Sequence, residues 1–257
     1  MQNAVSLRQR LAAGNTVSGM ILFSGSPMLV EMMAAAGVDF VVIDMEHSAL
    51  DLDTAAHVIR AADAAGVTPF VRIPEVDAAL VKKLLNLGAA GLALPHANRD
   101  NCAALLRAMR YAPEGDRGAC PMVRAAGYTR GDWSAYAARA NREVMAIPLL
   151  EDAASIEDFE ALAAMPGLDV FFIGPTDLSI SLGVPGASFD EPAMSAALDS
   201  VVARARQHGK VVMTTIGNRL EIDYGQRVAA RGVQMIVYGT DGDLFTDAMR
   251  RLAPIKG

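Results

Sequence analysis

Hydrophobic residues along this chain follow two alternating spacings. Short apolar runs rich in β-branched residues, such as 40–44 (FVVID) and 169–174 (DVFFIG), are separated by longer Ala- and Leu-rich stretches with helical spacing. The short runs predict buried strands, and the longer stretches predict amphipathic helices. Regular alternation of the two predicts a parallel sheet wrapped by helices.

The pattern predicts eight strand–helix units, which favour a closed TIM (β/α)8 barrel in one domain, 1–257, over an open doubly wound sheet. No GxGxxG motif follows the first strand, so a dinucleotide site is not expected. The expected strands are 18–23, 40–44, 69–73, 91–94, 145–151, 169–174, 210–215 and 234–238. The expected helices are 26–36, 51–65, 77–87, 98–110, 155–164, 191–208, 219–231 and 241–251, after a short N-terminal helix that ends near Gly14.

Local residues mark several of these helix ends. Ser155, with Asp158 three residues later, suits the start of a helix as an acidic variant of a capping box. The long stretch 111–144 is rich in Gly and Arg at its beginning, which is typical of a functional loop or an interface. Left-handed C-terminal caps are expected at four glycines that follow helical stretches: Gly66, Gly88, Gly209 and Gly232.

Composition narrows the class of protein. With 52% hydrophobic and 20% charged residues, the 257-residue chain has enough apolar side chains for a large core. Its net charge of −6 and the lack of a basic cluster argue against a nucleic-acid surface. No apolar run approaches the roughly 20 residues of a membrane helix, and the first residues lack the apolar core of a secretory signal, so neither feature is expected. Cys102 and Cys120 have no metal-ligand spacing, so a reduced cytoplasm is the expected compartment.

Two lone carboxylates close consecutive strand-like runs. Glu151 ends MAIPLLE, and Asp177 follows DVFFIGPTD. The carboxyl ends of barrel strands gather at one rim, so the two acids are expected to converge there as ligands of a hard divalent cation. The alternative is that each acid merely favours the N-terminus of the next helix through the helix dipole.

Two further strand ends carry charged groups. Asp44 and His47 in VVIDMEH form an acid–histidine pair, in which Asp44 is expected to hold the imidazole as a catalytic base. Glu46 between them has no assigned role, and the alternative for His47 is a helix cap without a proton to move. Arg72 lies inside an apolar strand and needs an anionic partner. It either forms a structural salt bridge to a strand-end acid or clamps a substrate carboxylate or enolate oxygen.

The turn GPTDLS adds backbone donors to this rim. The N–H groups of Thr176 and Asp177 open a helix and are expected to bind a substrate carboxylate. His96, at the end of the fourth strand, is a candidate for substrate contact. The four lysines fall in helices, at the opposite barrel end or in the C-terminal tail, so a Schiff base is not expected. A metal is then the expected electron sink for carbanion chemistry.

Taken together, these segments resemble the HpcH/HpaI aldolase family of metal-dependent pyruvate aldolases. The similarity covers about residues 18–240 and lies in several motifs that occur in order: VVIDMEH, PFVRIP, KKLLNLGAAGLALP, YAPEGDRG, LLED and FFIGPTDLS. The resemblance implies a barrel enzyme that uses Mg²⁺, Mn²⁺ or Co²⁺ to cleave 4-hydroxy-2-oxo acids into pyruvate and an aldehyde. It also implies a homohexamer, a trimer of dimers whose C-terminal helices are exchanged between subunits.

The resemblance also implies residue roles. It places the metal ligands on Glu151 and Asp177 and the catalytic histidine on His47, with Asp44 as its partner acid. It places the enolate-stabilising cation on Arg72. The amides that hold the pyruvate carboxylate correspond to those of residues 176 and 177.

The chain departs from its relatives on the aldehyde side of the pocket. Relatives commonly have glutamine at the position of Leu149, glycine at Met45 and an apolar residue at His96. We therefore expect Leu149 and His96 to influence which aldehyde is accepted. The alternatives are a related enzyme that decarboxylates or condenses oxaloacetate-like 2-oxo acids, and a barrel that only binds a metabolite.

Overall fold

The structure is a computed structural model that describes residues 2–128, 131–216 and 221–252. Its strands are β1 (Val17–Leu22), β2 (Phe40–Asp44), β3 (Thr68–Arg72), β4 (Gly91–Leu94), β5 (Met145–Leu150), β6 (Val170–Ile173), β7 (Val211–Thr215) and β8 (Met235–Thr240). Its helices are α1 (Gln2–Ala12), α2 (Pro27–Ala35), α3 (Leu52–Ala65), α4 (Ala78–Leu87), α5 (Arg99–Met109), the short 3₁₀ helix η1 (Arg124–Ala126), α6 (Trp133–Glu143), α7 (Ala153–Glu157), α8 (Phe159–Ala163), α9 (Pro175–Ser181), α10 (Pro192–Gln207), α11 (Ile222–Ala230) and α12 (Asp241–Leu252).

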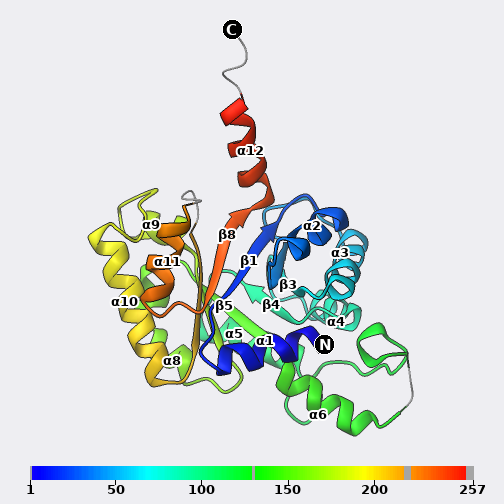
Figure 1. Cartoon of the computed structure of the whole chain (residues 1–257). Helices are drawn as coiled ribbons and strands as arrows, with labels where there is room; N and C mark the ends of the chain where they lie inside the picture. The colour runs from blue at the N-terminus through cyan, green and yellow to red at the C-terminus, as the bar shows by residue number, and fades with distance from the viewer. Residues whose placement is uncertain (1, 129–130, 217–220, 253–257) are drawn as a thin grey trace.

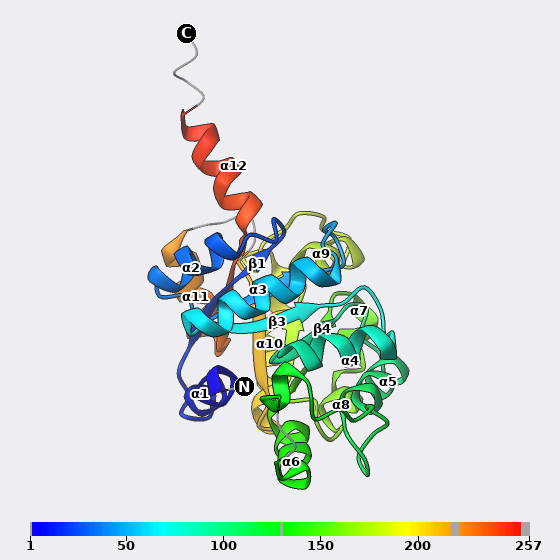
Figure 2. The ribbon, with the colours of Figure 1, turned by 90° about the vertical axis from the view of Figure 1, so that its right-hand side faces the viewer.

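The eight strands form a closed barrel in sequence order, and every neighbouring pair is parallel. The helices surround the barrel, while α1 lies across one end of it (Figures 1 and 2). The last helix, α12, does not pack along the barrel but extends away from its opposite end. The predicted (β/α)8 barrel is confirmed. Within the described ranges, no helix is long and apolar enough to cross a membrane.

One predicted helix differs from the structure, and the predicted start of another lies outside the described residues. The segment 155–164 forms two short helices, α7 and α8, and the first begins earlier because Asp152 is its N-cap. The Asp152 side chain accepts the N–H of Ser155 at 2.7 Å, so the predicted cap at Ser155 was wrong by three residues. Helix α11 was expected to begin at residue 219, but residues 217–220 lie outside the described residues. The four glycines predicted as left-handed caps all have positive φ angles.

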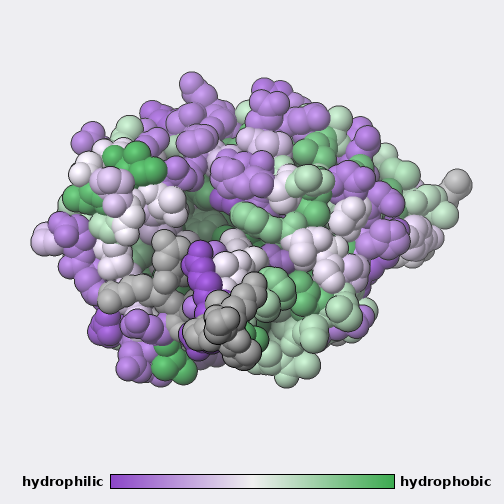
Figure 3. All heavy atoms as spheres, turned by 90° about the horizontal axis from the view of Figure 1, so that it is seen from above, coloured by the Kyte–Doolittle hydropathy of each residue, from purple (hydrophilic) through white to green (hydrophobic). Residues whose placement is uncertain are grey.

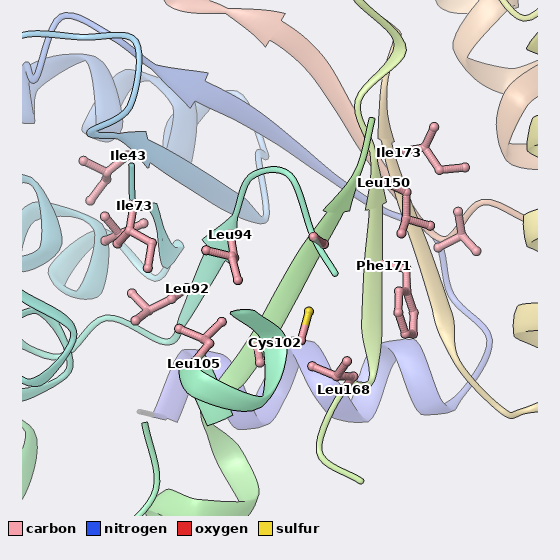
Figure 4. Packing of buried hydrophobic residues seen from close by; sticks show 14 of the residues in the cluster. Ile43, Ile73, Leu92, Leu94, Cys102, Leu105, Leu150, Leu168, Phe171 and Ile173 are labelled. Carbon is pink, nitrogen blue, oxygen red and sulfur yellow. The ribbon is translucent and has the colours of Figure 1, made fainter. Parts of the chain in front are cut away.

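Strand side chains alternate between the barrel interior and the surrounding helices. In β5, Met145, Ile147 and Leu149 belong to the interior cluster, whereas Leu150 faces the helical layer. Leu7 and Leu11 of α1 join the same interior cluster and close the N-terminal end of the barrel. The outer layer between strands and helices is seen in Figure 4, where residues of α5 pack against β4 and β5.

Because side chains along a strand alternate between inward and outward, the inward series also determines which polar groups reach the rim. Phe40 and Val42 of β2 point inward, so Asp44 continues the inward series at the strand's carboxyl end. Phe70 and Arg72 of β3 follow the same rule, as does Glu151 immediately after β5. The barrel geometry thereby places three charged side chains above the apolar interior layers.

The irregular stretch 111–144 forms a separate packing unit at the other end of the barrel, because α6 leads directly into the start of β5. Its aromatic side chains pack on one another, with Tyr111 and Trp133 at a ring separation of 5.1 Å. The Asn141 side chain bonds both the N–H and the carbonyl of Tyr111, at 2.8 and 3.0 Å. Within this subunit the stretch therefore has a structural role away from the rim.

Candidate active site

Asp44 and Arg72 form a buried ion pair at the carboxyl ends of β2 and β3. The two residues are directly paired in the strand register. Arg72 donates from Nε to Oδ2 of Asp44 at 2.6 Å, and its Nη2 also contacts this oxygen. Asp44 is fully buried and Arg72 is 9% exposed, so the guanidinium is held at a defined place above the barrel interior. Of the two roles considered for Arg72, the salt bridge to a strand-end acid is present, and the clamp on a substrate oxygen stays a prediction.

The expected contact between Asp44 and the His47 ring is not what the structure contains. Oδ1 of Asp44 accepts the backbone N–H groups of Glu46 and His47, at 2.9 and 2.7 Å. Its other oxygen is occupied by Arg72. The His47 ring instead lies beside Glu46, with 3.6 Å between Nε2 and Oε2. The prediction was wrong because the turn after β2 folds its own amides onto Asp44, which leaves the imidazole to a different acid.

Glu46 lies between the cation and the histidine. Its Oε2 is 3.2 Å from Nε of Arg72, and only 14% of its side chain is exposed. Burial raises the pKa of Glu46, and the charges of Arg72 and His47 partly oppose that increase. Sequence reasoning placed Glu46 at the rim but assigned it no role.

Glu151 occupies the inward position after β5 and is 5% exposed. Its Oε1 accepts the backbone N–H of His96 at 2.5 Å and lies 3.2 Å from Nδ1 of the same residue. Burial raises the pKa of Glu151, and the charges of Glu46 and Asp177 add to the increase, while the N–H and ring of His96 oppose it. Asp177 stands exposed in the first turn of α9. The two predicted acids therefore share one electrostatic environment.

This pair of carboxylates suits a divalent cation. A positive ion would offset both the burial of Glu151 and its repulsion by Asp177. Carboxylate oxygens are preferred ligands of Mg²⁺ and Mn²⁺, which commonly keep other positions for water or substrate. No group of three or more His, Cys, Asp and Glu residues in the described parts of the chain forms a metal cage. The protein would thus supply two ligands and leave the others open.

His96 has an unusual backbone. Its φ of 48° lies in the left-handed region, which is uncommon for residues other than glycine. This conformation directs its N–H at Glu151, a role that sequence reasoning missed because no sequence pattern identifies a left-handed histidine. The His96 side chain is 72% exposed. Leu149, the other predicted substrate contact, is 1% exposed and lies within the interior cluster below Glu151.

The turn after β6 is built as expected. Helix α9 begins at Pro175, so the N–H groups of Thr176 and Asp177 lie in its first turn, where α-helical amides have no intrahelical partner.

The described lysines lie away from the rim. Lys82 and Lys83 lie in α4, and Lys210 precedes β7 at the opposite barrel end, with its Nζ 3.6 Å from Oδ1 of Asp169. Lys256 lies outside the described residues. Seen from the carboxyl ends of the strands, the surface has a hollow with hydrophobic atoms at its floor and hydrophilic side chains along part of its edge (Figure 3).

Residues 3–248 match the profile of the HpcH/HpaI aldolase/citrate lyase family. The chain belongs to this family. Membership identifies it as an enzyme of the aldolase type, a carbon–carbon lyase.

Relatives of this aldolase-family chain align over most of its length. It is 37% identical to the hydroxypyruvate/pyruvate aldolase of Paraburkholderia phytofirmans (strain DSM 17436 / LMG 22146 / PsJN), with 79% of this chain and 80% of the relative covered. It is 33% identical to the 4-hydroxy-2-oxovalerate aldolase of Rhodococcus jostii (strain RHA1), with 98% and 96% covered. Among solved structures, the citrate synthase SbnG is similar with a TM-score of 0.84, 31% identity and 97% of both chains covered.

Proposed function

We propose that this family member is a divalent-metal-dependent aldolase that cleaves, or in reverse forms, 4-hydroxy-2-oxo acids. The products are pyruvate and an aldehyde, and the reaction proceeds through a pyruvate enolate. The observation that carries the proposal is the arrangement of a rigid, buried cation, Arg72, at the same rim as the carboxylate pair Glu151 and Asp177. With a divalent cation on the two carboxylates, this arrangement would place positive charge where an enolate oxygen develops negative charge.

Each group at the rim has a binding role in this proposal. Glu151 and Asp177 hold the divalent cation, which when bound acts as a Lewis acid toward the 2-oxo acid. The N–H groups of Thr176 and Asp177 bind the substrate carboxylate. Arg72, fixed by Asp44, donates to the enolate oxygen.

His47 is proposed to move the proton. Its ring takes the proton of the 4-hydroxyl group while the C3–C4 bond breaks. The electrons of the O–H bond form the aldehyde carbonyl, and those of the C3–C4 bond form the enolate. Protonation of the enolate at C3 then completes pyruvate. His47 has 56% of its side chain exposed, so a substrate can reach it.

Exchange of the C3 protons of pyruvate in D₂O tests enolate formation without knowledge of the aldehyde. We expect exchange with added Mg²⁺, Mn²⁺ or Co²⁺, little exchange in metal-stripped protein, and loss of exchange in Arg72→Ala. Glu151→Gln is expected to lose metal-dependent exchange as well. Full exchange in either folded variant would contradict the proposal.

The aldehyde side is proposed to depend on His96 and Leu149. The exposed ring of His96 offers a hydrogen-bonding group beside the metal site. Leu149 acts from below, because its side chain fills the interior directly beneath the rim. A panel of aldehydes offered with pyruvate to His96→Met and to the wild type is expected to give different product ratios, with pyruvate exchange retained.

A second candidate function follows from the similarity to a citrate synthase. The same enolate can be used for condensation with another carbonyl compound or can arise by decarboxylation of oxaloacetate. Turnover of oxaloacetate, together with failure of every pyruvate–aldehyde pair, would favour this alternative. Aldol products from pyruvate would favour the aldolase.

The assembly proposed from the family resemblance is a homohexamer, a trimer of dimers that exchange α12. Helix α12 stands away from its own barrel (Figure 2) and exposes Leu244, Phe245, Met249 and Leu252. A groove of about 1130 Å³ is lined mostly by apolar residues of β1, α2, α11, β8 and α12, among them the exposed Met32 of α2. A second copy's helix would cover these side chains. Light scattering after size-exclusion chromatography is expected to give a hexamer, and the Phe245→Glu variant is expected to give smaller species.

A cytoplasmic location remains an expectation.

A further inference from the structure

A second cavity lies at the end of the barrel opposite to the active site. It has a volume of about 670 Å³ and lies where α1 and the C-terminal end of α10 meet the first residues of β6 and β7 (Figure 1). The volume falls within the range of small-molecule sites in proteins. Part of its wall is apolar, with Val202 and Val211 among the lining side chains. None of the groups that line it takes part in the reaction proposed above.

The charged side chains that line this cavity are mostly basic. Arg8, Arg206 and Lys210 are the basic lining residues, whereas Asp169 is the only acid among the described residues that line it. The cavity thus carries an excess of positive charge, although the whole chain has a net charge of −6. A concave surface lined by charges of one sign raises the local concentration of ions of the opposite sign. The cavity is therefore suited to an anion.

The single acid does not satisfy the three cations. Oδ2 of Asp169 accepts from Nη1 of Arg8 at 3.2 Å, and its Oδ1 lies 3.6 Å from Nζ of Lys210, which is longer than a hydrogen bond. Nη2 of Arg8 is buried and has no hydrogen-bond partner in the part of the chain that the structure describes. Arg206 forms no ion pair with a described acid, and its Nη2 would lie 2.9 Å from a Cβ added at Gly232.

Lys210 indicates most clearly that a partner is missing. Only 15% of its side chain is exposed, so its ammonium group has lost much of its contact with water. Burial of a charge is unfavourable unless the charge is paired and hydrogen-bonded. The carboxylate of Asp169 is shared with Arg8 and is too far away to accept a hydrogen bond from Nζ. An anionic group in the cavity would supply the acceptor that Lys210 lacks.

We propose that this cavity is a binding site for a small organic anion that carries a carboxylate or phosphate group on an apolar body. The anionic group would accept hydrogen bonds from Lys210 and Arg206, while the apolar body would contact Val202 and Val211. Ammonium and guanidinium groups are common partners of both kinds of anion. The site lies at the other end of the barrel from the catalytic rim, so the proposal does not depend on the proposed aldolase function.

Thermal unfolding of the full-length, metal-stripped protein tests for binding. Monobutyl phosphate and pentanoate are the probes, because they present the two anionic groups on a similar apolar body. Butanol is the neutral comparison, and NaCl keeps the ionic strength constant. We expect a saturable rise in melting temperature with at least one of the two anions and none with butanol, because a ligand that binds only the folded state stabilises it. The anion with the higher apparent affinity identifies the preferred head group.

Variants then show where the anion binds. Lys210→Met and Arg206→Gln are each expected to weaken the apparent affinity roughly 5-fold or more, because each removes a charged hydrogen-bond donor. Asp169→Asn is expected to strengthen the affinity, because it removes the negative charge that competes with the ligand. A merely structural role of Asp169 would change the melting temperature without this gain. Arg107→Gln, at an arginine with 71% of its side chain exposed, and Arg72→Ala, at the active site, are expected to leave the affinity unchanged.

Two results would overturn the proposal. One is the absence of a saturable rise in melting temperature with either anion. The other is an apparent affinity that Lys210→Met and Arg206→Gln leave unchanged, since the anion would then bind elsewhere; a loss of affinity in Arg72→Ala would place it at the active site. Each variant is compared with its own melting temperature without ligand, so a general loss of stability does not imitate a loss of binding.

Discussion

Replacing Asp44 by alanine should destabilise the barrel more than replacing any charged residue on the surface. Asp44 is fully buried, and its carboxylate satisfies the Arg72 guanidinium and two backbone N–H groups. Removal leaves Arg72, 9% exposed, without its main counter-charge. Breaking a buried pair from one side costs about 3–5 kcal/mol, because the remaining charge stays desolvated.

The expected change is large enough to measure by thermal unfolding. For a chain of this length, about 2 °C of melting temperature corresponds to 1 kcal/mol, so Asp44→Ala should melt roughly 6–10 °C below the wild type. Asp116→Ala is the matched control, since the Arg107–Asp116 pair has side chains that are 71% and 66% exposed. An exposed pair contributes at most about 1 kcal/mol, and the control should stay within about 2 °C of the wild type.

Asp44→Asn separates charge from shape in the same assay. The amide oxygen still accepts the two backbone N–H groups, while the counter-charge of Arg72 is lost. Its melting temperature should lie between those of Asp44→Ala and the wild type, and its metal-dependent pyruvate exchange should fall because the cation is no longer held in place. If Asp44→Ala melted as the Asp116→Ala control does and exchanged pyruvate protons at the wild-type rate, the assignment of Asp44 as the support of Arg72 would be refuted.

Three further predictions concern the metal site and its surroundings. The pKa of Glu151 in the folded protein is raised above its ordinary 4.5, so the metal-free protein should lose stability as the pH rises from about 4.5 to the raised pKa, because folding then opposes ionisation of Glu151. The affinity for Mn²⁺ should increase over the same pH range, and a pH-independent affinity in calorimetric titrations would contradict this. Gly174→Ala should weaken Mn²⁺ binding with little change in melting temperature, since its Cβ would lie 3.1 Å from Cβ of Glu151 and displace the carboxylate; unchanged affinity would show that the site adapts. Leu149→Gln should lower the free energy of unfolding by about 1–3 kcal/mol in a denaturant titration, because the position is 1% exposed and an amide buried there lacks partners. In the aldehyde panel the same variant should accept a different range of aldehydes, while pyruvate exchange persists.

Most of the fold was predictable because its determinants are local. The β-branched runs identified every strand to within about two residues, for example 40–44 and 91–94 without error. Glycines that follow helices correctly predicted left-handed caps, because such a cap depends only on the local backbone conformation, which glycine adopts easily. Errors arose where two local starts competed, as at Asp152 and Ser155, which are both good capping residues.

The location of the site was predictable for a related reason. In a parallel barrel every strand's carboxyl end reaches the same rim, and side chains alternate inward and outward, so strand positions alone bring Asp44, Arg72 and Glu151 together. The sequence alone thereby determined the barrel, the rim and the charged residues at the rim. It did not determine which group each of them contacts.

Those contacts were decided by the tertiary structure. The register that pairs Asp44 with Arg72 uses the carboxylate that the sequence had assigned to His47, and Glu46 is the acid that remains beside the ring. A left-handed His96 brings a backbone N–H to Glu151 across two strand ends. Hydrogen bonds and ion pairs depend on differences of a few tenths of an ångström between residues far apart in the chain. Spacing along the sequence carries no such information, and only the closed barrel supplies it.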